Sequence, residues 1–111
     1  MAIVINLTPH VVSVVSNDGN IIASFPSQGV ARAAQKAVVI GDVNGIELAS
    51  MTFGSPQDLP DPQMDTFFIV SALTANAAKV QGRPTDDLLI TADPVRDAEG
   101  RVVGCRRFAI V

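Results

Sequence analysis

Apolar runs of strand length alternate with short polar segments along the whole chain, and this alternation limits the folds that the chain can adopt. The apolar runs are rich in valine and isoleucine, which favour β-strands, whereas the polar segments hold the Pro, Gly, Asn and Asp residues that favour turns. The clearest case is the pair of runs 36–43 and 46–53, which flank an Asn-Gly pair. Because Asn-Gly accepts the positive φ angles of a two-residue turn, this segment predicts a β-hairpin. Turn-forming segments at 16–20 and 97–100 predict two more hairpins.

A single substantial helix is predicted after the apolar strand at 66–70. Residues 72–80 are rich in alanine, Ser71 is a suitable N-cap, and a glycine and a proline soon afterwards end the helical pattern. Another strand follows directly, so we expect a strand–helix–strand unit with a right-handed crossover. Residues 54–65, which hold three of the seven prolines, predict a long ordered loop.

Together these elements make about eight or nine strands and one helix. We therefore expect a single domain over residues 1–111, of the α+β class and mainly β. Antiparallel hairpins would form a sheet or a small barrel-like sandwich, with the one helix packed on it.

The composition favours association between copies of the chain. Hydrophobic residues make up 48% of the sequence and charged residues only 17%. A small monomer has a high ratio of surface to volume, so part of this apolar excess must lie on its surface. Since soluble proteins cover such surface by symmetric association, we expect a homo-oligomer.

Several classes of partner and site are disfavoured by the same composition. The net charge is −3 and there is no basic run, which argues against nucleic-acid binding. One cysteine, Cys105, and one histidine leave no internal disulfide and no metal cluster built on these residues within one chain, and no cofactor is expected. We also expect a cytoplasmic protein without a membrane partner, because the amino terminus lacks the pattern of a signal peptide and no apolar run approaches the length of a membrane span.

Two polar residues lie where a strand begins or ends. His10 follows Thr-Pro at the start of a predicted strand, where it could orient a ligand or act as a general base, or simply hydrogen-bond the nearby backbone. Ser71 lies at the predicted strand-to-helix junction, where it could bind an anion with the help of Thr74 or serve as an ordinary N-cap. The glycines that flank a hydrolase nucleophile are missing on both sides of Ser71.

The arginines next to turns are the second set of candidates. Arg32 follows the turn that opens with Pro26-Ser27, and it could clamp a phosphate or carboxylate, or pair with an acidic residue such as Asp86 or Asp87. Arg83 and these two aspartates follow the helix, where they could hold a ligand or form a salt-bridged connection. Two adjacent carboxylates without further spaced oxygen ligands are weak support for a metal site.

Six motifs follow one another along the chain: Ile5-Asn6-Leu7-Thr8-Pro9-His10, Pro26-Ser27 with Val30-Ala31-Arg32, Ile69-Val70-Ser71-Ala72-Leu73, Arg83 to Asp87, Pro94-Val95-Arg96-Asp97 and Gly100 to Cys105. In this order they resemble a family of short, uncharacterised proteins from bacteria and their phages. The resemblance spans nearly the whole chain and supplies no activity. The chain departs from the pattern at Gln28, since the turn's glycine is expected one position earlier. By analogy, small oligomeric phage proteins of this kind can sequester nucleotide-derived immune signals of the host.

Three functions remain open on the sequence alone. The first is a non-catalytic module that binds a small anionic, nucleotide-like molecule. The second is a small hydrolase that uses Ser71 or His10. The third is a structural or protein-interaction subunit in which the polar segments serve only as caps and turns. The ligand-binding hypothesis assigns no catalytic residue and no metal ligand, and it places its ligand against His10, Ser27, Arg32, Ser71, Thr74, Arg83 and Asp86.

Overall fold

The computed structural model describes residues 2–111 and places them in eight strands and one helix. This confirms the expected α+β, mainly β class. The elements are β1 (Ile3–Asn6), β2 (Val12–Val15), β3 (Ile21–Phe25), β4 (Gln35–Val43), β5 (Ile46–Phe53), β6 (Thr66–Ile69), α1 (Ala72–Val80), β7 (Leu88–Arg96) and β8 (Val102–Ala109).

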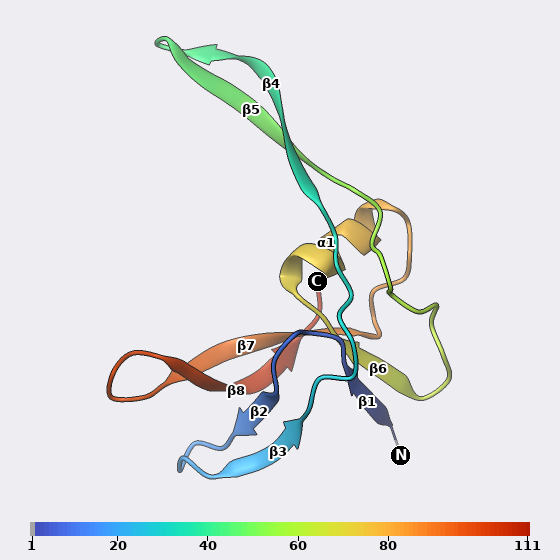
Figure 1. Ribbon diagram of the computed structural model, residues 1–111, viewed down its shortest axis with the longest axis vertical. Helices are drawn as coiled ribbons and strands as arrows, with labels where there is room; N and C mark the ends of the chain where they lie inside the picture. Colours follow the sequence, from blue (N-terminus) through green and yellow to red (C-terminus); the bar gives the residue numbers. More distant parts are fainter. Residues whose placement is uncertain (1) are drawn as a thin grey trace.

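Six of the strands form one mixed sheet in the order β1-β6-β7-β8-β2-β3. The hairpins β2–β3 and β7–β8 are antiparallel, as the turn segments indicated, and β6 and β7 are parallel neighbours joined through α1. Two further parallel pairings, β1 with β6 and β2 with β8, join strands that are far apart in the sequence. An isolated parallel bridge between Asn6 and Ser27 brings the end of β3 back to the end of β1, so the sheet curls (Figure 1).

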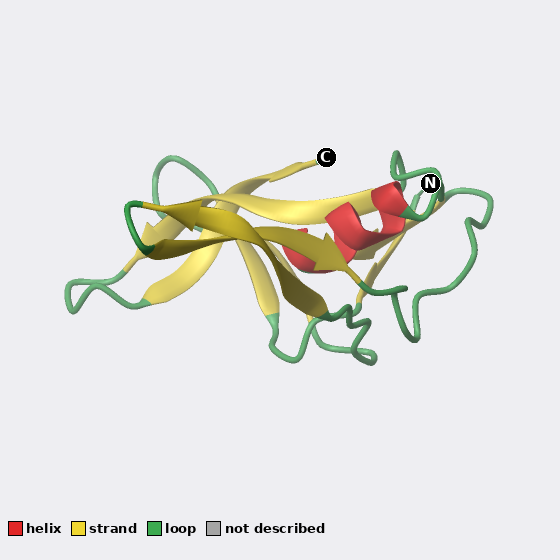
Figure 2. Ribbon diagram, turned by 90° about the horizontal axis from the view of Figure 1, so that it is seen from above, coloured by secondary structure: helices red, strands yellow, loops and turns green. Residues whose placement is uncertain are grey.

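The core lies where α1 packs on the sheet (Figure 2). Ala75, Ala77 and Ala78 are fully buried on the helix, and their small side chains let its backbone approach the strands closely. On the sheet, Phe68 and Leu88 are the large side chains that pack beneath the helix, so the buried alanines meet bulky partners. The cluster of buried residues is Leu7, Ala31, Phe68, Val70, Ala75, Ala78 and Leu88.

Strand β8 passes very close to β2. A Cβ atom on Gly104 would lie 2.8 Å from Cγ2 of Val15 and 2.9 Å from the carbonyl oxygen of Ser13. The second of these neighbours is backbone and cannot move without opening the sheet. A glycine is therefore needed at this position for β2 and β8 to pair.

Strands β4 and β5 form a separate two-stranded sheet that projects from the rest of the molecule (Figure 1). We call residues 35–53 the arm and the other described residues the body. Every arm residue in the two strands is exposed except Phe53, which is half-buried at the root. The projection is visible in the radius of gyration, 16.5 Å, whereas a compact chain of this length has about 13 Å.

Candidate functional site

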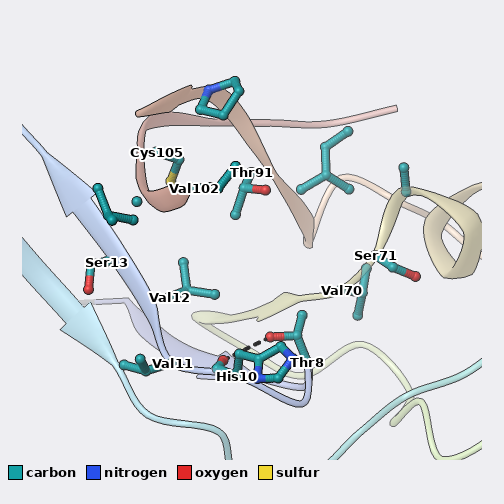
Figure 3. Close-up of a pocket in the computed structure, with 15 residues that line it drawn as sticks. Thr8, His10, Val11, Val12, Ser13, Val70, Ser71, Thr91, Val102 and Cys105 are labelled. Atoms are coloured by element: carbon teal, nitrogen blue, oxygen red, sulfur yellow. Dashed lines mark hydrogen bonds between the residues drawn. The ribbon is translucent and has the colours of Figure 1, made fainter. Parts of the chain in front are cut away.

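The body contains a cleft of about 700 Å³ between β2, the β6–α1 junction and the β7–β8 hairpin (Figure 3). Valine, isoleucine, alanine and proline side chains make up most of its lining, and no arginine or lysine is among the lining residues that the structure describes. The polar groups are three hydroxyl residues from strands or loops, Ser71 at the helix start and His10. The lining residues are Thr8, His10, Val11, Val12, Ser13, Val70, Ser71, Ala72, Ile90, Thr91, Pro94, Val102, Val103, Gly104 and Cys105.

Asn6 fixes the end of the cleft that carries His10. Its amide nitrogen donates to the carbonyl oxygens of His10 at 2.7 Å and Phe25 at 2.8 Å. Its carbonyl oxygen accepts from the backbone nitrogen of Thr8 at 2.9 Å and from the Thr8 hydroxyl at 2.6 Å. The side chain is completely buried, and all its hydrogen-bonding groups are used. Asn6 therefore joins the end of β1 to the residues just ahead of β2 and to the end of β3. Sequence reasoning did not identify it as a site residue.

His10 and Ser71 both line the cleft, as the ligand-binding and hydrolase hypotheses required. Ser71 is the N-cap of α1: its hydroxyl accepts from the backbone nitrogen of Thr74 at 3.1 Å and donates to the Thr74 hydroxyl at 2.9 Å. These bonds confirm the predicted cap. In the part of the chain that the structure describes, no hydrogen bond joins Ser71 to His10, so the arrangement holds no serine activated by a histidine.

Arg83 forms a salt-bridged connection with Asp87. This was one of the two alternatives that the sequence left open for Arg83, and the other was contact with a ligand. Its two terminal nitrogens contact the two carboxylate oxygens of Asp87 at 2.8 and 3.0 Å. The same nitrogens donate to the carbonyl oxygens of Pro84 at 2.7 Å and Pro60 at 2.8 Å. Asp87 is buried, and Arg83 is almost so. The guanidinium thus ties the loop 54–65 to the start of β7 rather than facing the cleft.

The other predicted ligand residues lie away from the cleft lining. Arg32 is exposed, and its backbone forms an isolated antiparallel bridge with Gln57. Ser27 is exposed and donates to the carbonyl oxygen of Thr8 at 2.6 Å. Thr74 belongs to the first turn of α1 and is buried, and Asp86 is exposed. The structure therefore places His10 and Ser71 in the lining of one cleft, and it places Arg32 and Arg83 outside that lining.

Cys105 lines the cleft with a thiol that is almost entirely buried. Burial raises the pKa of this thiol, so little reactive thiolate forms at neutral pH. We expect iodoacetamide to alkylate Cys105 in the folded protein roughly tenfold or more slowly than in urea-unfolded protein, because reaction must wait for opening of the fold. Mass spectrometry of timed samples gives both rates. Equal rates in the two samples would show that the cleft is open to solvent at this position.

Exposed large apolar side chains are densest on the arm. The body exposes nine of them, whereas the 19 residues of the arm expose seven. These seven are between 43% and 72% exposed, and they occupy both faces of the ribbon. The cross-strand register places Val43, Ile46 and Leu48 on one face near the tip, and Asp42 and Glu47 directly opposite each other on the other face. The arm's exposed large apolar residues are Val38, Val39, Ile40, Val43, Ile46, Leu48 and Met51.

The hairpin itself was predicted from the Asn-Gly turn, but its exposure was not. A usable signal was present in the sequence: Val38-Val39-Ile40 has no alternation between apolar and polar residues. A strand apolar on both faces must be covered on both faces. The body covers only the root of the arm, where Phe53 is half-buried, and leaves the other strand residues of the arm exposed.

Comparisons with protein-family models, with curated proteins and with solved structures find no match for this chain. Among residues 2–111, no helix is long and apolar enough to cross a membrane.

Proposed function

We propose that this protein is a structural or protein-interaction subunit that associates with copies of itself through the arm. The observation that carries the proposal is the exposure of apolar side chains on both faces of a two-stranded ribbon. An isolated two-stranded hairpin is marginally stable in water, because it cannot bury an apolar face by itself. Contact with another chain would bury these side chains and hold the arm in its extended form.

The surface area of the chain supports the same proposal. The solvent-accessible area is 7280 Å², whereas a folded monomer of this mass has about 5,800 Å². The excess is about 1,400 Å² per chain, whereas an interface of ordinary size buries only about 800 Å² on each partner. Two ordinary interfaces per chain, or one interface of the larger size found in obligate homodimers, would therefore bring the exposed area to the level of a compact protein.

A shortened arm tests the proposal. Lys36 and Thr52 face each other across the ribbon, so residues 37–51 can be replaced by Asn-Gly with the root of the hairpin retained. We expect light scattering after gel filtration to give a multiple of the chain mass for the original protein and a single chain mass for the shortened one. Circular dichroism of both proteins serves as the control for folding. A monomeric original protein, or an unchanged assembly after shortening, would contradict the proposal.

The second candidate function is binding of a small molecule in the cleft. It is favoured by the cleft's volume, which lies in the usual range for ligand pockets, and by the presence of His10 and Ser71 in its lining. Such a ligand would be apolar over most of its surface, with a polar edge toward these two residues. Titration calorimetry with a panel of nucleotides and cyclic nucleotides tests the nucleotide-like class. Heat that disappears in His10→Ala would support binding, whereas no heat with any member would remove that class.

A further inference from the structure

We infer that the arm tip of one copy inserts into the apolar cleft of a second copy, an inference that rests on the proposed self-association. The tip presents an apolar face made by Val43, Ile46 and Leu48, which are 53%, 72% and 46% exposed. The cleft presents incompletely covered apolar walls on the body. Each surface lacks cover within its own chain, and the two have the same chemistry.

The cleft walls show how much surface remains to be covered. Val11, Val102 and Val103 all line the cleft, yet they are 61%, 57% and 52% exposed. A large apolar insert would remove this area from water, and burial of apolar surface would stabilise the contact.

The insert must come from a second copy. The arm leaves the body in the direction away from β2 and β3, so its tip and those strands lie at opposite ends of the molecule (Figure 1). Strand β4 has 9 residues, which gives the arm a length of about 30 Å. The tip of an arm held in this direction cannot reach the cleft of its own chain.

The charges near the two surfaces are complementary. On the other face of the tip, Asp42 and Glu47 lie directly opposite each other, and two like charges in this position destabilise a ribbon. Strand β8, which forms one wall of the cleft, carries Arg106. Arg106 is exposed, and in the described part of the chain it donates to the carbonyl oxygen of Ser16 rather than to a carboxylate. Arg106 directly follows Cys105, the last β8 residue in the cleft lining, so a second copy offers the acidic pair an exposed cation on a strand of the cleft.

Insertion of a tip into a cleft joins two different surfaces, so each copy can donate one arm and receive another. Contacts of this head-to-tail kind build a closed ring when the rotation between copies closes, and a filament when it does not. A symmetric pair in which two arms pack on each other would instead leave the cleft empty. Assembly therefore needs the cleft residues when the tip inserts into the cleft, and it does not need them when two arms pack on each other.

Two variants separate these arrangements. Ile46→Asp removes the apolar tip and leaves the cleft intact, and Val103→Asp places a charge in the cleft and leaves the arm intact. Both side chains are more than half exposed, so neither change should prevent folding. We expect each variant alone to have the mass of one chain, and an equal mixture of the two to form a species of two chains, since one intact tip can still enter one intact cleft.

Native mass spectrometry of the original protein, each variant and the mixture measures the number of chains in each species. Ile22→Asp is the matched control, because Ile22 is also 66% exposed on a strand but lies outside the arm and the cleft. It is expected to assemble like the original protein. Should Val103→Asp fail to fold by circular dichroism, Val11→Asp places a charge in the same cleft from the residue before β2.

The outcomes distinguish this inference from the proposed function. An original protein that is monomeric would remove both. Assembly that survives Val103→Asp, or variants that do not combine in the mixture, would overturn the insertion while self-association through the arm stands. A small molecule retained in the cleft of the assembled protein would also overturn the insertion, because it would identify a different occupant.

Discussion

Replacing Asn6 by aspartate is expected to lower the free energy of unfolding by about 3–4 kcal/mol, although the two side chains have nearly the same shape. The amide nitrogen of Asn6 donates to two carbonyl oxygens at 2.7 and 2.8 Å, and the side chain is 0% exposed. A carboxylate would place an acceptor against these two acceptors, with its charge away from water. The two carbonyls belong to His10, just ahead of β2, and to Phe25 at the end of β3, so the loss reaches β2 and β3.

Urea unfolding followed by far-ultraviolet circular dichroism measures this effect, since the chain has no tryptophan or tyrosine for fluorescence. All variants are compared at one protein concentration, because association adds to apparent stability. The control is Asn17→Asp, which makes the same chemical change at an exposed turn residue. It is expected to change the free energy of unfolding by less than about 0.5 kcal/mol. Equal effects of the two changes would show that the Asn6 hydrogen bonds do not hold the strands.

Replacing Arg83 by alanine is expected to cost about 2–4 kcal/mol of the free energy of unfolding. The change leaves the Asp87 carboxylate buried without a cation and releases the carbonyl oxygen of Pro60 in the loop 54–65. Arg83→Lys should recover only part of this loss, because one ammonium group cannot reproduce the two parallel contacts of the guanidinium.

The same urea experiment measures the Arg83 effect, with Arg101→Ala as the matched control. Arg101 pairs with Asp97 and Glu99, but its side chain is 73% exposed. Exposed pairs of this kind contribute between about 0 and 1 kcal/mol. The double change of Arg83→Ala with Asp87→Asn should be milder than Arg83→Ala alone, since no buried charge then lacks its partner. Equal losses for the single and double changes would contradict this explanation.

Local signals in the sequence predicted the local structure well. The Asn-Gly pair predicted the turn between β4 and β5, where Asn44 and Gly45 have φ angles of 53° and 81°. Ser71 predicted the start of α1, and the run 66–70 predicted β6. These features depend on residues within a few positions of one another, and their conformations are set by backbone sterics and capping hydrogen bonds.

The long-range features could not be predicted from single residues. The parallel pairings of β1 with β6 and of β2 with β8 depend on packing between distant segments, and the close approach at Gly104 becomes visible only once those strands are paired. Arg83 had two alternatives that the sequence could not separate, because the choice depended on where the fold placed Asp87. The exposure of the arm was not predicted, since an apolar hairpin is more often part of a core.

Hydrogen exchange of the arm as a function of protein concentration tests most directly whether the arm is an interface between copies. We expect the amides of residues 36–53 to be protected at high concentration and to exchange rapidly after dilution, because a free two-stranded ribbon opens readily. The amides of β6 and α1, which lie in the core of the body, should keep their protection at both concentrations. Rapid exchange along the arm at every concentration, in protein whose core stays protected, would contradict the proposal that the arm is covered by a second copy.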